Sequence, residues 1–408
     1  MKKIISIMLG AVLMASFGFG CKNQTKDMFD GFDTTAKKYA SRSVELNNLV
    51  RDNYWIDDTL FAFHYYPNYG GSSDKAMSTA YVWPYTEMVA NNWRIATLSK
   101  GSKDHVADFY KNTINGYEYY KSMRNDYLAY TASRAAMKGM GSGDTYYDDN
   151  VWISREFLNA YEVLGDEEYF DISKQVIEYI WSGWAKDDLG GIYWFEQRKE
   201  SRNTCSNAPA VILFARMYQH TQDQIYLDRA IQIYNFCYTN LRDPSDNVYW
   251  DNISNDGVVN TWKFTYNTGS MIAAGVKLYE ITQEQKYLDH AKASALGSYN
   301  HFFNQSDRGY KTINMHNPWF NLLLLDGYVE QYRYDENALE YIQNYEANLN
   351  YAYENYKSEQ GFMPANWVNG FSKDNEGKII IKDLNILDMA ANSENFGLLA
   401  YFYEYIKR

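Results

Sequence analysis

The sequence predicts an all-α fold, an (α/α)6 toroid or barrel of helical hairpins. Three observations carry this prediction: a weak internal repeat, an alternation of buried and half-exposed helical patterns, and only 6 proline residues among 408. Proline breaks helix interiors, so its scarcity suits a mainly helical chain. Hydrophobic residues make up 46% of the chain, which is enough for a large core and argues against intrinsic disorder.

The internal repeat joins two helical patterns through a short turn. Its three copies end in Tyr-Phe-Asp or Tyr-Leu-Asp, at Tyr169, Tyr226 and Tyr287, and these tyrosines are spaced 57 and 61 residues apart. A nearly all-apolar segment precedes the turn, as in 209–218, and an amphipathic segment follows it, as in 228–237. A buried helix, a tight turn and a half-exposed helix make a helical hairpin.

About six such hairpins are expected, the first of them from residues 34–50 and 78–97. The repeat is longer than the period of most solenoids. Hairpins arranged around an axis would give inner and outer rings of helices, with loops at one end surrounding a cleft. The alternative is an open right-handed α-solenoid of the kind that binds proteins.

The N-terminus resembles a bacterial lipoprotein signal. Two lysines precede an apolar run over residues 4–20, and Cys21 follows directly. This pattern predicts a signal peptide rather than a spanning helix. We therefore expect residues 1–20 to be removed and Cys21 to carry lipid, which would anchor an exported protein to a membrane at the periplasm or cell surface. Residues 21–30 are expected to form a tether and residues 31–408 a single domain.

Composition restricts the partners. Acidic residues outnumber basic ones by 51 to 39, and nucleic acids need a basic surface, so nucleic-acid binding is not expected. Aromatic residues reach 17% of the chain; they either fill the core or partly line a cleft and stack on sugar faces. Beyond Cys21 only Cys205 and Cys237 remain, with no Cys/His cluster, so we expect no metal site and no cofactor. A monomer is expected.

An acidic, aromatic-rich cleft suits glycoside hydrolysis by two carboxylates. An Asp-Asp pair occurs three times, beginning at Asp57, Asp148 and Asp187. On spacing alone, each pair is more readily a helix cap or part of a solvated loop. The second pair differs because two tyrosines precede Asp148 and Asp149, and an apolar helical pattern over 153–164 follows them.

Two neighbouring carboxylates cannot easily both ionise when they are partly buried. One pKa rises while the other stays low, which supplies an acid and a nucleophile from the same residue type. Adjacent side chains can place their carboxyl groups about 5 Å apart, the separation found in retaining rather than inverting glycosidases.

Three blocks of sequence extend beyond the aspartate pair. They are Tyr-Asp-Asp-Asn-Val-Trp at 147–152, Gly-Gly-Ile-Tyr-Trp at 190–194 with Cys-Ser-Asn-Ala-Pro at 205–209, and Phe-Thr-Tyr-Asn-Thr-Gly at 264–269. In this order and spacing they resemble glycoside hydrolase family 76, the α-1,6-mannanases. The resemblance implies an (α/α)6 barrel and a retaining, endo-acting hydrolase of α-1,6-linked mannan. It also implies that Asp148 is the nucleophile and Asp149 the acid/base.

Further residues near these blocks are candidate sugar ligands. The polar ones would hydrogen-bond sugar hydroxyls, or else cap helices and satisfy turns; the tryptophans would stack on sugar rings, although Trp152 could equally belong to the core. The candidates are Trp152, Trp194, Asn207, Trp262, Tyr266 and Asn267. Gly190, Gly191 and Gly269 are expected to mark backbone with positive φ or a close approach.

The leading hypothesis is therefore an enzyme that cuts α-mannan poly- or oligosaccharides. One alternative keeps the fold and changes the chemistry, to transglycosylation or to hydrolysis of another glycan. A second is a non-catalytic glycan-binding protein. A third is a protein-binding helical repeat, which would have no cleft at the aspartate pair.

Overall fold

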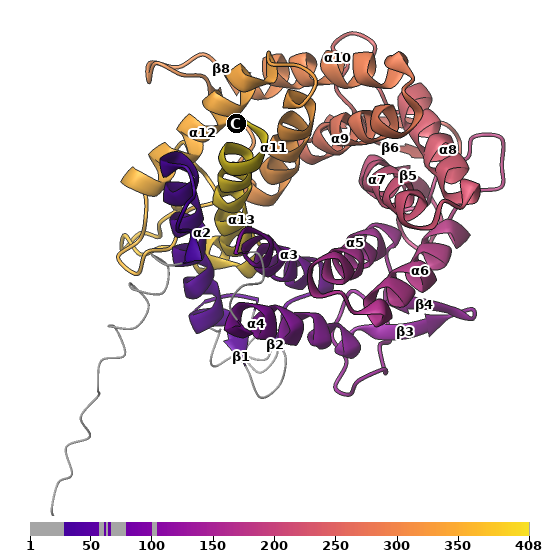
Figure 1. Cartoon of the computed structure of the whole chain (residues 1–408), viewed down its shortest axis with the longest axis horizontal. Helices are drawn as coiled ribbons and strands as arrows, with labels where there is room; N and C mark the ends of the chain where they lie inside the picture. Colours follow the sequence, from indigo (N-terminus) through magenta and orange to yellow (C-terminus); the bar gives the residue numbers. More distant parts are fainter. Residues whose placement is uncertain (1–27, 57–60, 63, 67–78, 100–103, 408) are drawn as a thin grey trace, which may run out of the picture.

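The chain forms a ring of helices (Figure 1). The computed structural model describes residues 28–56, 61–62, 64–66, 79–99 and 104–407. The predicted signal peptide and Cys21 lie outside these residues. Of the predicted tether, residues 28–30 are described, and Phe29 is fully buried in the core. Across the described part of the chain, no helix combines the length and the apolar character needed to cross a membrane.

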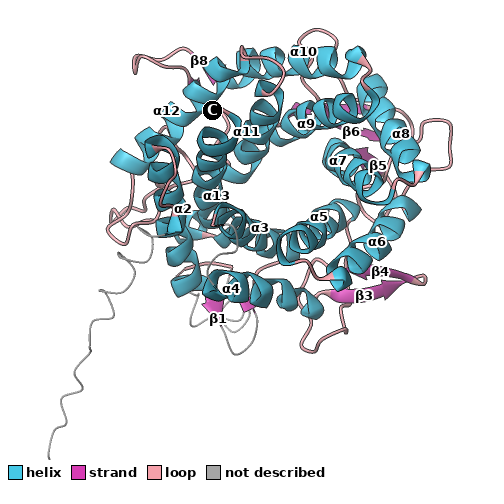
Figure 2. Ribbon diagram, in the orientation of Figure 1, coloured by secondary structure: helices cyan, strands magenta, loops and turns pink. Residues whose placement is uncertain are grey.

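Twelve α-helices of the described residues alternate between an outer and an inner ring (Figures 1 and 2). The outer ring consists of α2 (Thr34–Tyr54), α4 (Asp104–Asn115), α6 (Glu167–Ser182), α8 (Gln224–Asn240), α10 (Gln285–Phe302) and α12 (Ala338–Asn355). The inner ring consists of α3 (Val82–Leu98), α5 (Tyr147–Leu164), α7 (Thr204–Thr221), α9 (Thr265–Thr282), α11 (Pro318–Tyr332) and α13 (Ile386–Tyr401). The ring is closed, because α13 packs on both α2 and α3. The predicted (α/α)6 barrel is confirmed.

Short antiparallel strands lie in the connections. They are β1 (Trp55–Ile56) with β2 (Phe61–Ala62), β3 (Lys121–Arg124) with β4 (Tyr127–Tyr130), β8 (Phe303–Asn304) with β9 (Thr312–Ile313), and a three-stranded sheet in the order β5 (Ser201–Asn203), β6 (Trp250–Ser254), β7 (Val259–Lys263). Two 3-10 turns span Gly116–Tyr119 and Ile381–Leu384, and a π-helical turn, Phe402–Ile406, follows α13. The strands of the three-stranded sheet directly precede α7 and α9, so this sheet lies at the N-terminal end of the inner helices.

The internal repeat marks the turn from an inner helix to the next outer one. Helix α5 ends at Gly165, whose left-handed φ of 73° stops the helix, and Asp166 then caps α6 by accepting a backbone N–H. Gln222 and Asp223 do the same between α7 and α8. The repeated tyrosine, such as Tyr226, is buried one turn later. The predicted hairpins are confirmed at these turns, whose shape comes from a left-handed cap followed by an N-cap. The hairpin expected from residues 34–50 and 78–97 is wrong, because these residues form outer helix α2 and inner helix α3, and α2 packs mainly on α13.

The inner helices are surrounded by protein on most sides, so their polar residues are buried along with their apolar ones. In α13 every residue from Ile386 to Ala400 is buried. Helices α9 and α11 approach so closely that a Cβ on Gly269 would lie 2.2 Å from the backbone oxygen of Leu323. Gly190 and Gly191 have φ values of +70° and +87°. The expectations for these three glycines are confirmed.

Candidate active site

A large cavity opens where the inner helices begin. Its volume is about 1200 Å³. Each of the six inner helices contributes to the lining from its second or third residue. These residues are Trp83, Pro84, Asp148, Asp149, Cys205, Tyr266, Trp319, Phe320, Leu387 and Asp388. The positive ends of six helix dipoles therefore converge on the cavity, which favours negative charge there.

The predicted aspartate pair lies in the first turn of α5, at the wall of this cavity. The Asp148 carboxylate accepts two side-chain hydrogen bonds, both on Oδ2. The indole Nε1 of Trp194 donates at 3.0 Å, and the Sγ of Cys205 donates at 3.4 Å. The other oxygen, Oδ1, has no hydrogen-bond partner among the described residues. Both side-chain donors thus hold the same oxygen.

The two carboxyl groups have different affinities for a proton. Burial raises the pKa of Asp148 to about 6, while the Cys205 and Trp194 donors oppose the rise by stabilising the ionised form. The pKa of Asp149 is raised well above its usual range, by burial first and then by the neighbouring charge of Asp148. Near neutral pH the pair therefore consists of an ionised Asp148 and a protonated Asp149. The sequence predicts one raised and one low pKa, whereas burial raises both and Asp149 is raised well above its usual range.

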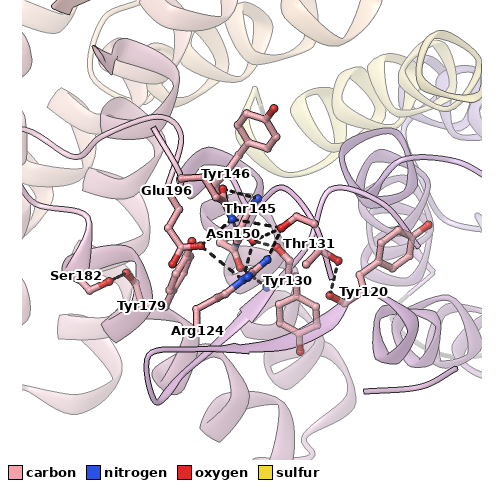
Figure 3. Close-up of polar contacts among 12 residues, drawn as sticks. Tyr120, Arg124, Tyr130, Thr131, Thr145, Tyr146, Asn150, Tyr179, Ser182 and Glu196 are labelled. Carbon is pink, nitrogen blue, oxygen red and sulfur yellow. Dashed lines mark hydrogen bonds and ion pairs between the residues drawn. The ribbon is translucent and has the colours of Figure 1, made fainter. Parts of the chain in front are cut away.

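A polar framework holds the start of α5 in place (Figure 3). The Asn150 amide donates to the backbone oxygens of Tyr130 and Tyr146 and accepts from the Tyr130 N–H at 2.8 Å. Arg124 donates to Thr145 Oγ1 at 3.0 Å and lies 3.6 Å from the Glu196 carboxylate. The Tyr146 ring points away from this network (Figure 3) and lines the cavity. The aspartate pair is thus fixed between β4 and the segment that carries Trp194.

Aromatic rings form the floor and one wall of the cavity. Trp319 meets Trp152 and Trp83 edge to face, with ring centroids 5.3 and 5.1 Å apart. Tyr266 packs at 4.2 Å on Phe320 beside this floor. At the rim Trp262 is 68% exposed, so its ring is available for stacking.

Charged residues occupy the barrel axis below the tryptophan floor. They line a second, small cavity of about 20 Å³ that shares Trp83, Trp152 and Trp319 with the first. Glu87 and Glu394 hydrogen-bond each other there, and Arg94 lies 3.5 Å from Glu394. Burial raises the pKa of Glu156 to about 7. This buried layer supports the floor from beneath.

The structure places the predicted sugar ligands in two groups. Four of them line the cavity, namely Trp152, Trp194, Trp262 and Tyr266. Asn207 and Asn267 are fully buried. The Asn207 amide accepts from the Ile192 N–H and donates to the backbone oxygens of Ile192 and Asn203, so it braces the loop that carries Trp194.

Three further carboxylates line the cavity and were not among the predicted residues. Asp144 is exposed and lies just before the aspartate pair in sequence. Asp251 lies on β6, and burial raises its pKa. Asp388 lies on α13, where it accepts from the Asn385 amide at 2.6 Å, and burial raises its pKa to about 6. Asp388 has the same place in its helix as Asp149, so aligning the starts of the inner helices is the signal that would have found it. Of the other Asp-Asp pairs, the one at Asp57 lies outside the described residues.

The described residues contain no group of three or more metal-ligating side chains. The cavity lining includes carboxylates, one thiol and aromatic rings, together with asparagines, serines and His64. Two carboxyl groups of unequal pKa beside an aromatic surface can carry out acid/base and nucleophilic chemistry on a sugar.

Comparison with known proteins agrees with this chemistry. The sequence model of glycosyl hydrolase family 76 matches residues 55–318. The chain belongs to this family. A family 76 glycoside hydrolase from a bovine Bacteroides thetaiotaomicron strain is 25% identical, with a TM-score of 0.79 over 89% of this chain and 77% of that one. A family 76 mannosidase from B. thetaiotaomicron VPI-5482 is 26% identical, with a TM-score of 0.78 over 89% of this chain and 98% of that one.

A curated relative is similar over a shorter stretch. The mannan endo-1,6-alpha-mannosidase of Saccharomyces cerevisiae is 27% identical over 138 residues. This match covers 31% of the chain and 30% of the yeast enzyme, so the chain is aligned with less than a third of that relative. Family membership makes the chain a glycosidase of the six-hairpin type.

Proposed function

We propose that this glycosidase hydrolyses α-1,6-mannosidic linkages inside α-mannan chains, with retention of the anomeric configuration. The observation that carries the proposal is the pair formed by Asp148 and Asp149, which differ in pKa and lie together at the wall of an aromatic cavity. The names of two relatives, a mannosidase and a mannan endo-1,6-alpha-mannosidase, support mannan as the substrate.

In the proposed mechanism Asp148 attacks the anomeric carbon while Asp149 protonates the departing glycosidic oxygen. The product of this step is a glycosyl ester on Asp148, and Asp149 is left as a carboxylate. Asp149 then removes a proton from water, which attacks the same carbon and releases Asp148. Two successive inversions give net retention.

An internal cleavage site requires a cavity longer than one sugar. The cavity volume of about 1200 Å³ exceeds the roughly 300–1,000 Å³ typical of small-ligand pockets. Aromatic rings reach from the tryptophan floor to Trp262 at the rim, which supports several sugar positions rather than one.

The test is incubation of the purified protein with linear α-1,6-mannan, followed by chromatography of the products and NMR of their anomers. We expect mannooligosaccharides of mixed length in the early products, and the α anomer to form first. Asp148→Asn and Asp149→Asn should each lower kcat by about 10²–10⁴-fold or more. Asp188→Asn, in the exposed Asp-Asp pair at the surface, is the matched control and should retain full activity.

Three outcomes would contradict parts of the proposal. Full activity in either Asp148→Asn or Asp149→Asn would refute the site. Release of the β anomer first would refute the retaining mechanism. Efficient transfer to added acceptor sugars, with little hydrolysis, would favour the alternative of a transglycosidase.

We also propose that the enzyme is exported and anchored by lipid on Cys21. The basic and apolar pattern of residues 1–20 supports this proposal. Radiolabelled fatty acid should enter the wild-type protein and not a Cys21→Ala variant. Equal labelling of the two would contradict it.

A further inference from the structure

Cys205 contacts the proposed nucleophile directly. It is the second residue of α7, its side chain is 7% exposed, and its Sγ lies 3.4 Å from Asp148 Oδ2. Trp194 is the other side-chain donor to that oxygen, and Oδ1 has no hydrogen-bond partner among the described residues. The thiol is therefore one of two side-chain groups that hold this carboxylate.

The thiol acts as a donor and not as a competing nucleophile. Burial, followed by the negative charges of Asp148 and Asp251, raises the pKa of the Cys205 thiol well above its usual range. Tyr266 lies beside the sulfur and opposes part of this rise. The S–H of Cys205 donates to the Asp148 carboxylate. Neither neighbour removes the thiol proton at neutral pH.

We propose that Cys205 is a positioning residue for Asp148: its S–H donor fixes Oδ2 and favours the ionised carboxylate that attacks the sugar. The proposal rests on the role of Asp148 in the proposed function. A thiol is a weaker donor than a hydroxyl. The thiol therefore stabilises the negative charge of Asp148, but its hydrogen bond to the carboxylate is weaker than that of a hydroxyl.

Four titratable groups face Asp148, and their protonation affects its titration. They are Asp149 on the same helix, Tyr146 just before it, Cys205 on α7 and Tyr266 on α9. The pKa of Asp149, of the thiol and of both tyrosines is raised by burial, so each of these groups keeps its proton while Asp148 ionises. Among these facing groups, Asp148 is therefore the first to lose its proton as the pH rises.

The experiment follows Asp148 through its other donor. The ¹⁵N–¹H signal of the Trp194 indole, identified by its loss in Trp194→Phe, should shift as Asp148 ionises. Removing the thiol donor in Cys205→Ala should raise the midpoint of this shift by about one pH unit, since a tenfold change in proton affinity equals one unit. Cys205→Ser replaces the thiol with a stronger donor and should keep the midpoint at or below the wild-type value. Cys237→Ala, a fully buried thiol on α8, is the matched control and should not move it.

Activity supplies the second measurement. At pH 6, Cys205→Ala should lower kcat/KM on α-1,6-mannan about fivefold through kcat, with KM little changed, because the ionised fraction of Asp148 falls from about one half to about one tenth. The loss should shrink as the pH rises. An unchanged Trp194 midpoint in Cys205→Ala would overturn the positioning role. If the wild-type protein did not cleave mannan, the proposed function would fail while the Trp194 titration would still decide the role of Cys205.

Discussion

Glu156 lies in the charged layer below the tryptophan floor, and its ionisation should destabilise the fold. Its side chain is 2% exposed, and burial raises its pKa from 4.5 to about 7. A carboxyl group with a raised native pKa binds its proton more tightly in the folded state than in the unfolded state. Stability is therefore lost as the pH rises from 4.5 to 7, and this loss is absent below 4.5 where both states are protonated.

The difference in pKa corresponds to about 3 kcal/mol, since each pH unit is worth about 1.4 kcal/mol. Glu156→Gln keeps an oxygen that can accept from the Asn159 amide, which donates to Glu156 at 3.1 Å, but cannot ionise. The variant should therefore gain stability over the wild type as the pH rises, by about 3 kcal/mol between pH 4.5 and pH 8.

Urea denaturation, followed by circular dichroism at several pH values, measures this difference. Glu167→Gln, an exposed residue in the first turn of α6, is the control and should show no comparable pH-dependent gain. A stability difference between Glu156→Gln and the wild type that is the same at pH 5 and pH 8 would refute the reasoning. So would a difference that favours the wild type more at the higher pH.

Two further predictions concern packing and substrate contact. Gly269→Ala should lower the unfolding free energy by about 2 kcal/mol or more. The new Cβ would meet the Leu323 backbone, which cannot rotate away. Equal urea midpoints for the variant and the wild type would contradict this. Trp262→Ala should leave the unfolding free energy unchanged, since the ring is exposed. It should raise KM for long mannooligosaccharides several-fold, because stacking on the ring is lost. An unaltered KM would show that Trp262 does not belong to the substrate-binding surface.

The fold followed from the sequence because its signals are local. The turns at Gly165 and Gln222 each combine a left-handed cap with an acidic N-cap, and both features belong to a few consecutive residues. The tyrosine that follows each turn is buried, so its spacing reports the size of one hairpin. Repeated local patterns of this kind can be recognised in the sequence without knowledge of the tertiary structure.

The site was only partly predictable because its contacts are not local. Asp148 meets Trp194 and Cys205 across 46 and 57 residues of sequence, and Asp388 joins them from the last helix. An asparagine at the start of an inner helix has the same sequence pattern whether its amide faces a cavity or the backbone of a loop. Asn207 faces the backbone, and only the packing of α7 against residues 192–203 decides this.

The packing of α2 against α13 has a consequence for how the protein folds during synthesis. The first and last α-helices of the described residues are neighbours, so the ribosome must finish the chain before α2 can pack on α13. Until then the nascent protein is an arc with an uncovered end, and its sugar cleft lacks the sector that carries Asp388. Contacts between such distant segments form slowly. The closed ring therefore forms only when the whole polypeptide is available for folding.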